Sequence, residues 1–340
     1  MPKKTITIQS MCDTKTTAVA QTIKQIKQLE KEGCDLVRVA VPDLASAKAL
    51  TKIKPQIKIP LIADIHFNPA LALAAIENGA DKIRINPGNI QDKKMLAEIA
   101  AAAKKRKIPI RIGVNSGSFS RQPTPGNLAD EAIKWTEFFE DQKFKNLVIS
   151  IKSSDPQTVI EANEILHTKL KRRKTPYPIH LGVTEAGTLI TGITKSTIAL
   201  ASLLKKGIGN TIRISLTEDP VLEIKAAKEL LKSLGLYTKE PLIISCPTCG
   251  RTEIDLKKLT KEIEKELAKV KFKPRTKPLK VAVMGCVVNG PGEAREADYA
   301  ICGGRGQGAI YKKGKHLKTT PENKLVKDFI KLIKKNEQAS

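Results

Sequence analysis

The sequence is short of aromatic residues, of long apolar segments and of acidic side chains. Phe, Trp and Tyr make up only 4% of the 340 residues, so the base-stacking groups that usually accompany a basic nucleic-acid interface are scarce. No apolar run approaches the ~18 residues that a membrane-spanning helix needs. The N-terminal residues form neither an apolar secretion signal nor an Arg- and Ser-rich import signal, which predicts a cytoplasmic protein.

The deficit of acidic residues gives the chain a large positive charge. Lys and Arg number 60 against 35 Asp and Glu, a formal net charge of +25. This surplus favours phosphate-bearing or acidic partners, although it is equally compatible with a solvated basic surface. The cations are spread along the chain, and only 12 of the 60 are Arg. We therefore expect neither a nucleic acid nor a membrane as partner.

Short apolar runs alternate with segments of helical periodicity through the first two thirds of the chain. This alternation predicts parallel strands joined by right-handed helical crossovers. Eight such units in about 235 residues favour a closed (β/α)8 TIM barrel of the α/β class, which we assign to residues 1–238. The expected strands are Thr5–Met11, Leu36–Val41, Leu61–His66, Lys82–Asn86, Ile110–Asn115, Leu147–Lys152, Ile179–Thr184 and Thr211–Leu216.

A helix over Pro220–Leu234, stopped by Gly235, completes the barrel and leaves residues 239–340 for a small second α/β domain. Its expected parts follow one another along the chain. They are a Cys-rich turn (Ser245–Arg251), a charged helix (Asp255–Lys269), a strand (Val281–Met284), a Gly-rich stretch (Gly303–Gly308) and a closing helix (Pro321–Lys335).

Four arginines occupy the centres of predicted barrel strands, each flanked by aliphatic residues. If the aliphatic neighbours face the helices, the arginines must point into the barrel, where they need anions or carboxylates. They could pair internally with Asp64 or Glu218, but too few inward carboxylates are available for all of them. An anionic ligand, such as a diphosphate or phosphate ester, is therefore favoured. The cations are Arg38, Arg84, Arg111, Arg213 and, in an equivalent position, Lys152, and the accompanying polar residues at strand ends are Asp64, His66, Asn86, Asn115, His180, Glu185 and Ser215.

Three cysteines predict a metal centre in the second domain. Cys246 and Cys249 form a Cys-x-x-Cys knuckle, and Cys286 opens a Gly-rich turn after a predicted strand. Structural zinc needs a closed set of four ligands, which Cys302 or His316 could complete. An iron–sulfur cluster accepts three cysteines and a different fourth ligand. The spacing alone leaves both open, and with them two rival functions: a zinc-knuckle nucleic-acid-binding protein, and a phosphate-ester barrel enzyme with a structural zinc domain.

Several motifs, in order from about Gln9 to Gly314, resemble the 4-hydroxy-3-methylbut-2-enyl diphosphate synthase family, the iron–sulfur reductases of the methylerythritol phosphate route to isoprenoids. The motifs are Gln9–Met11, Ala63–Phe67, Arg84–Ile90, Arg111–Asn115, Ser150–Asp155, His180–Gly187, Gly207–Thr217, Ser245–Arg251 and Val283–Glu293. The chain departs from the family at Cys12–Thr16, which follows the first predicted strand, and Cys302 is an extra thiol.

The resemblance implies a barrel followed by a domain that carries a [4Fe–4S] cluster. It implies that the cluster is held by Cys246, Cys249, Cys286 and Glu293, that Glu293 yields its iron to substrate oxygen, and that Glu185 is the catalytic carboxylate. The substrate would be 2-C-methyl-D-erythritol 2,4-cyclodiphosphate, and ferredoxin or flavodoxin the electron donor. Its diphosphate would be bound by Arg38, Arg84, Arg111 and Lys152, with help from Asn86, Asn115, Arg213 and Ser215.

The segment between the two predicted domains suggests a homodimer. The last barrel helix carries the chain away from the mouth, and the eight residues Gly235–Leu242 span at most ~29 Å. A cluster that must reach a barrel mouth therefore serves a neighbouring subunit most easily. We expect a head-to-tail homodimer with two-fold symmetry.

Overall fold

The computed structural model describes residues 5–90, 92–173, 176–286, 288 and 290–338. Two compact units divide the chain, one formed by residues 4–230 and the other by residues 231–340. None of the helices in the described ranges combines the length and apolar character needed to cross a membrane.

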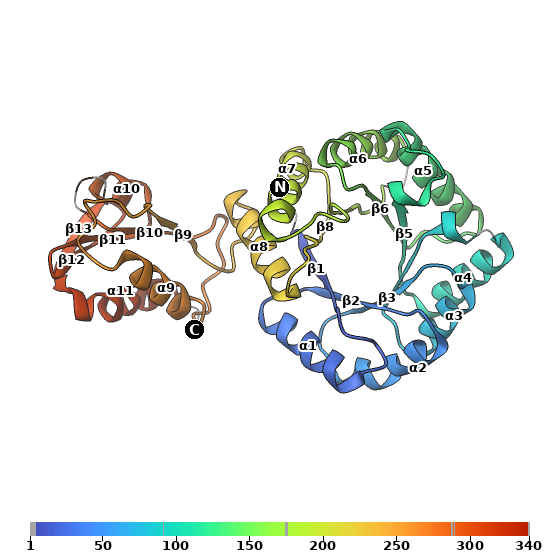
Figure 1. Ribbon diagram of the computed structural model, residues 1–340, viewed down its shortest axis with the longest axis horizontal. Helices are drawn as coiled ribbons and strands as arrows, with labels where there is room; N and C mark the ends of the chain where they lie inside the picture. The colour runs from blue at the N-terminus through green and yellow to red at the C-terminus, as the bar shows by residue number, and fades with distance from the viewer. Residues whose placement is uncertain (1–4, 91, 174–175, 287, 289, 339–340) are drawn as a thin grey trace. The chain divides into compact units, whose positions relative to one another are not determined.

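The first unit is a nearly closed barrel of parallel strands, as the alternation of strands and helices predicts (Figure 1). The strand order is β6-β5-β4-β3-β2-β1-β8-β7, and a bridge between Ile149 and Ile179 brings β6 beside the start of β7. The strands are β1 (Thr7–Met11), β2 (Leu36–Ala40), β3 (Leu61–Ile65), β4 (Lys82–Ile85), β5 (Ile110–Asn115), β6 (Leu147–Lys152), β7 (His180–Leu181) and β8 (Thr211–Ile212).

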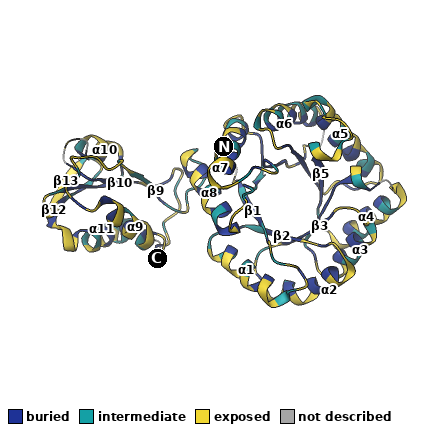
Figure 2. Cartoon of the chain, in the orientation of Figure 1, coloured by how far each residue is buried: buried dark blue, intermediate teal, exposed yellow. Residues whose placement is uncertain are grey.

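Helices surround the strands, with their buried faces toward the barrel and their exposed faces outward (Figure 2). Several begin at favourable caps: the side chains of Asn68, Thr124 and Asp155 each accept a backbone N–H from the first turn of the helix that follows. The helices are α1 (Val19–Lys31), α2 (Leu44–Ile53), α3 (Pro69–Glu77), α4 (Lys93–Arg106), α5 (Pro125–Asp141), α6 (Pro156–Lys171), α7 (Leu189–Lys205) and α8 (Pro220–Ser233), with short 3-10 turns η1 (Lys54–Gln56), η2 (Pro87–Asn89) and η3 (Ser116–Ser118).

The last two barrel strands are shorter than the sequence predicts. β7 and β8 pair only at two positions each, whereas Ile179–Thr184 and Thr211–Leu216 were expected to be extended. Beyond β7, Thr184 N–H donates to Ser153 O, and the next residue, Glu185, adopts a left-handed φ of 51°.

The second unit is built on a five-stranded mixed sheet in the order β13-β12-β11-β10-β9. Alternate residues of β10 face opposite sides: Val281 and Val283 pack beneath α9 and α11, whereas Ala282 and Met284 pack with Ala294 of α10. The elements are β9 (Leu242–Ser245), α9 (Leu256–Leu267), β10 (Lys280–Met284), α10 (Gly290–Glu296), β11 (Tyr299–Gly304), β12 (Gln307–Lys312), β13 (Lys315–Pro321) and α11 (Glu322–Glu337).

The predicted strand Val281–Met284 is confirmed as β10, and four further strands of this sheet were not predicted. The Gly-rich stretch is the end of β11, a two-residue turn and the start of β12, in which Gly306 supplies the positive φ of 65°. A second hairpin turns at Lys313 and Gly314, which both have positive φ and join β12 to β13.

Candidate active site

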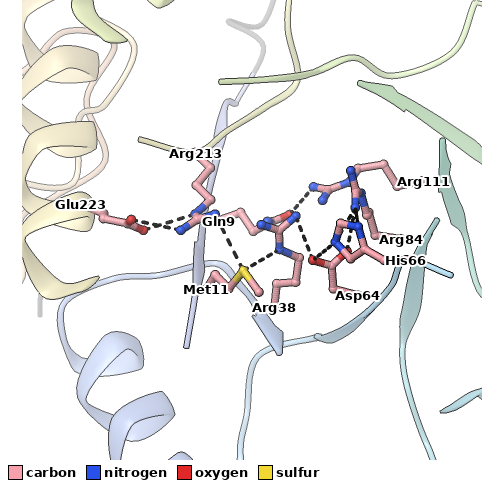
Figure 3. A network of polar contacts seen from close by, with 9 residues as sticks. All are labelled: Gln9, Met11, Arg38, Asp64, His66, Arg84, Arg111, Arg213 and Glu223. Carbon is pink, nitrogen blue, oxygen red and sulfur yellow. Dashed lines mark hydrogen bonds and ion pairs between the residues drawn. The ribbon is translucent and has the colours of Figure 1, made fainter. Parts of the chain in front are cut away.

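Asp64, the buried carboxylate of β3, is the centre of a polar network inside the barrel (Figure 3). Its Oδ1 lies 3.2 Å from Arg84 Nη1 and its Oδ2 lies 3.6 Å from Arg38 Nη1. His66 Nε2 lies 3.4 Å from Asp64 Oδ2 and 2.9 Å from Arg84 Nη1. Burial raises the pKa of Asp64, but Arg38, His66 and Arg84 outweigh it and hold that pKa well below the ordinary value. Asp64 is therefore an ion-pairing carboxylate at neutral pH.

Arg111, on β5, is buried deeper, with 1% of its surface exposed. Its Nη1 donates to Gln9 Oε1 at 3.0 Å, but its Nε and the Nε2 of Gln9 have no hydrogen-bond partner within the described ranges. Burial, reinforced by Arg38 and Arg84, lowers the pKa of Arg111 well below the usual value. A buried cation with an unused donor favours the arrival of an anion.

Lys152, at the end of β6, and His180, on β7, are also buried. Among the residues that the structure describes, neither ring nitrogen of His180 has a hydrogen-bond partner. Burial lowers the pKa of both groups, and the surrounding cations, including Arg38 and Arg111, lower them further. His180 is therefore neutral, and the Lys152 ammonium is destabilised until an anion reaches it.

Arg213, just after β8, is held by a carboxylate that the sequence reasoning missed. Glu223, on α8, accepts from Arg213 Nε at 3.3 Å and Nη2 at 3.1 Å (Figure 3). The same carboxylate accepts from Ser10 Oγ at 2.9 Å and from Leu216 N–H at 3.1 Å. Internal pairing of an arginine with Glu218 is not observed, since Glu218 is exposed. Glu223 lies on the helix that follows β8, so the alternation of the strand residues gives no signal for it.

Two glycines leave the space that the cations occupy. A Cβ atom on Gly113 would lie 2.6 Å from Arg84 Nε, and one on Gly182 would lie 2.9 Å from Lys152 Nζ and 2.6 Å from Arg213 O. All three contacts are shorter than real Cβ atoms tolerate. These glycines are therefore part of the site, because any side chain there would displace a cation or the backbone.

The remaining predicted residues lie at the carboxyl ends of their strands but outside this network. Asn86, after β4, donates to Ser118 Oγ at 2.6 Å and accepts from Gly88 N–H at 3.2 Å. Asn115 and Ser215 are half-buried, and Glu185 is exposed in the β7–α7 loop. Within the described residues, no hydrogen bond or ion pair joins these three side chains to the arginines. They line the same end of the barrel, which is where TIM-barrel enzymes place their chemistry.

The charges of the barrel interior do not balance. Within the described residues, the barrel interior has two buried carboxylates, Asp64 and Glu223, against five cations: Arg38, Arg84, Arg111, Lys152 and Arg213. Five guanidinium or ammonium groups beside two carboxylates form a site for a ligand with several negative charges.

The cysteines of the second unit gather at one edge of its sheet. β9 and β10 are parallel, with Ser245 opposite Val283, so Cys246 and Cys286 follow neighbouring strand ends. Cys246 Sγ accepts a hydrogen bond from Gly285 N–H at 3.3 Å. A backbone hydrogen bond from Arg251 and the positive charge of Arg251 lower the pKa of Cys249. Both features favour thiolates, the form in which cysteine binds metal.

Three residues are candidates for the fourth ligand of the metal centre: Cys302, Glu293 and His316. Cys302 is buried, and burial followed by the nearby Cys286 and Cys246 raises its pKa to about 12, so it is a neutral thiol. Glu293 is exposed in the first turn of α10. His316 lies on β13, three strands from β10, in an edge-to-face contact with Tyr311, which argues against it as a ligand. In the described ranges, which omit residues 287 and 289 beside Cys286, no three Cys, His, Asp or Glu side chains are already grouped to hold a metal ion.

The fold and the site define a TIM-barrel enzyme with a polycationic barrel interior and a separate α/β domain. Residues 2–228 match the model of the GcpE TIM-barrel domain, and residues 242–335 match that of the GcpE protein C-terminal domain. The chain belongs to the GcpE family, as its motifs led us to expect.

Curated relatives cover almost the whole chain. A protein of Clostridium perfringens is 52% identical over 336 residues, which are 96% of this chain and 93% of the relative. One from Caldanaerobacter subterraneus is 50% identical over 337 residues, 97% of this chain and 92% of the relative. Both are named 4-hydroxy-3-methylbut-2-en-1-yl diphosphate synthase (flavodoxin). Like these relatives, the chain is an oxidoreductase.

Among solved structures, the type I 3-dehydroquinate dehydratase of Clostridium difficile superimposes with a TM-score of 0.51 at 14% identity. The match covers 69% of this chain and 94% of the dehydratase. At that identity the similarity extends to the barrel fold alone.

Proposed function

We propose that the protein reduces 2-C-methyl-D-erythritol 2,4-cyclodiphosphate to 4-hydroxy-3-methylbut-2-enyl diphosphate. The observation that carries this proposal is the excess of buried cations over carboxylates in the barrel interior. The reaction opens the cyclodiphosphate ring at a carbon–oxygen bond and removes one hydroxyl as water. It consumes two electrons and two protons, which balances the reactant against the product and water.

The substrate's diphosphate is assigned to the five cations. Arg111 Nε has no hydrogen-bond partner in the described residues, Lys152 is buried among cations, and Arg84 and Arg38 share a single carboxylate, Asp64. Diphosphate oxygens would complete these hydrogen bonds and restore the charge of the destabilised Lys152 ammonium. The same ligand is assigned further contacts with the polar residues Asn86, Asn115, Ser215, His66 and His180. All but His180 lie at or after the carboxyl ends of their strands, and His180 is the buried first residue of β7. These positions support contacts to the ligand's hydroxyl and phosphate oxygens.

Glu185 is assigned the delivery of a proton. Its left-handed backbone, at φ 51°, holds an exposed carboxyl at the carboxyl end of β7. A non-glycine residue in that conformation is strained, which is common at functional sites. Glu185→Gln keeps the size and hydrogen bonding of the side chain but cannot transfer a proton. We expect kcat to fall at least about 100-fold while KM changes little. A rise in KM at unchanged kcat would show that Glu185 only binds substrate.

The cysteine edge is assigned a [4Fe–4S] cluster held by Cys246, Cys249, Cys286 and Glu293. The lowered pKa of Cys249 and the N–H donor to Cys246 suit thiolate ligands, and the carboxylate of Glu293 is a harder, more exchangeable ligand. When bound, the cluster supplies electrons and a Lewis-acidic iron. The high pKa of Cys302 supports its exclusion from the ligand set.

Metal analysis of anaerobically prepared protein tests the assignment. Iron and acid-labile sulfide in near-equal amounts are expected, whereas stoichiometric zinc without sulfide would contradict it. Glu293→Ala should leave the fold intact and impair cluster retention or turnover. The matched control, Cys302→Ser, should retain the cluster, and its loss there would show that the ligand set is wrong.

A flavodoxin, or alternatively a ferredoxin, is proposed as electron donor. Relatives about 50% identical carry flavodoxin in their names, and both donors are acidic proteins that a +25 chain attracts.

A head-to-tail homodimer is proposed as the working form. Exposed apolar residues surround the carboxyl end of the barrel, which supports a mouth covered by another surface. They are Leu44, Phe67, Leu189 and Ile190, of which Phe67 is 76% and Ile190 79% exposed. Val288, beside Cys286, is likewise exposed and would give the covering edge an apolar contact.

Complementation tests the dimer. An Arg111→Ala chain mixed with a Cys286→Ser chain should regain activity, because one of the two sites in the heterodimer would contain both intact halves. If mixed dimers form and stay inactive, or if a monomer is fully active, each cluster serves its own barrel.

A further inference from the structure

A groove of about 810 Å³ lies between α9 and α11, on the face of the second unit's sheet opposite α10. Its floor includes Val326 and Ile330, which pack on the hydrophobic core of the unit. The helices lie side by side in Figure 1. Neither the barrel site nor the cysteines account for this groove.

Lysines dominate the walls of the groove. Five of them line it, against two carboxylates, Glu262 and Glu266, and Glu266 is already bonded to Lys269 outside the groove. Within the described part of the chain, none of the five forms an ion pair. They are Lys265, Lys327, Lys331, Lys334 and Lys335. An apolar floor with uncompensated ammonium groups above it suits an acidic protein surface better than a small anion, which would leave the floor uncovered.

The groove also belongs to helices that start at the cysteine edge. α9 begins seven residues after Cys249, and Cys246 packs against the hydrophobic core beneath α9 and α11. α11 begins after Pro321, which pairs with Gln307 next to the β11 end that carries Cys302. Both helices therefore run from the cysteines toward the lysines.

We propose that the face of α9 and α11 is the docking surface for the acidic electron-donor protein, an inference that rests on the proposed function. Transient redox complexes bury roughly 600 Å² on each partner, a patch about 28 Å across. The 12 residues of α9 span only about 18 Å. A donor seated on the lysines thus also covers the starts of both helices and brings its redox group toward the cysteine edge.

Charge reversal in the groove tests the proposal. The variant Lys327→Glu/Lys331→Glu changes two exposed lysines, and the control Lys24→Glu/Lys27→Glu makes the same charge change on exposed positions of α1 in the barrel unit. Binding of purified flavodoxin to the cluster-loaded protein is measured at 50 and 300 mM salt. Turnover is measured with flavodoxin and, separately, with dithionite and methyl viologen.

The groove variant should bind flavodoxin at least about tenfold more weakly at low salt, with a smaller salt dependence, and keep its turnover with the small reductants. The control should behave as the unmodified protein does. If flavodoxin binding weakened equally in both variants, or weakened in neither, the docking surface would be overturned. The docking surface would also be overturned if the groove variant lost binding to duplex RNA or to anionic vesicles while its binding to flavodoxin stayed unchanged. Failure of the unmodified protein to turn over substrate with any reductant would instead overturn the proposed function, and the binding data would still decide the docking surface.

Discussion

Glu223 and Arg213 form the one ion pair in the described barrel site that joins the outer helices to a cation of the strands. Glu223 comes from α8, and it fixes the Arg213 guanidinium through Nε and Nη2 while also accepting the N–H of Leu216 in the β8–α8 loop. Glu223 is 2% exposed, so its bonds are not weakened by competition with water. It positions Arg213 rather than contacting substrate.

Replacing Glu223 by Gln should therefore damage binding through Arg213. The amide can accept one bond from the guanidinium but leaves its charge uncompensated, at a cost of about 1.5–3 kcal/mol. We expect KM for the cyclodiphosphate to rise about 10- to 100-fold and the melting temperature to fall by a few degrees. Ser10→Ala, which removes another partner of Glu223 but keeps its carboxylate, should change KM less than threefold. Equal effects of the two changes would show that only packing is involved.

Gly113→Ala should impair function without destabilising the fold. The added methyl would collide with Arg84 Nε, the end of a flexible side chain, so the guanidinium can move away and abandon Asp64. KM should rise at least about tenfold, with a melting temperature within about 2 °C of the original. Gly117→Ala, just after the same strand, adds a methyl with nothing within 4 Å and should be silent. Normal kinetics in Gly113→Ala would show that the position of Arg84 is unimportant.

Lys152→Met should have opposite effects on stability and on binding. The change removes a buried ammonium that lies among other cations. Thermal unfolding should shift upward by a few degrees, because a buried uncompensated charge is lost. Substrate affinity should fall at least about tenfold. A lower melting temperature would indicate that Lys152 has a stabilising partner in the free protein.

Lys82, at the start of β4, gives the barrel a pH dependence. Burial, with a contribution from Arg111, lowers its pKa from 10.5 to about 8. Above pH 8 the unfolded chain holds this proton and the folded chain releases it, so stability rises with pH. Above about pH 9 the buried thiols Cys12 and Cys34, whose pKa values are raised to about 12, act in the opposite direction.

Calorimetry between pH 8 and 9 tests this sign. The unmodified protein should gain at most about 1.4 kcal/mol over that interval from Lys82, and Lys82→Met should show a smaller gain. A steeper gain in Lys82→Met than in the unmodified protein would contradict the assignment.

The barrel and the direction of its arginines were predictable because both follow from periodicity. Val37 and Val39 flank Arg38, and the twofold alternation of a strand turns the arginine inward once the valines face the helices. The need of Glu223 for a polar partner could also have been predicted from the sequence. It lies four and seven residues before Ala227 and Leu230, within the buried stripe of α8, and a carboxylate in such a stripe needs a partner.

Periodicity did not predict which positions must be glycine to leave space for a neighbouring side chain. Nor did it predict the sheet of the second unit. Gly113 is needed because of Arg84 on the neighbouring strand, and a single sequence does not reveal which residues face each other across strands. The hairpin around Gly306 was predicted only as a Gly-rich stretch, because Gly303, Gly304, Gly306 and Gly308 dominate it. Gly303 and Gly308 in fact lie in strands, where Ile254 and Leu325 fill the space beside them.

The two-residue ladders of β7 and β8 leave the barrel with a weak seam. β5 and β6 are paired at six positions, whereas β7 and β8 are paired at two. Amide hydrogens along this seam should therefore exchange with solvent through local opening earlier than those of β5. Lys152 on β6 and Arg213 after β8 lie on either side of β7. A multivalent anion bound by both Lys152 and Arg213 would hold the two sides of this weakly paired region together. The barrel would then be fully rigid only with its substrate bound.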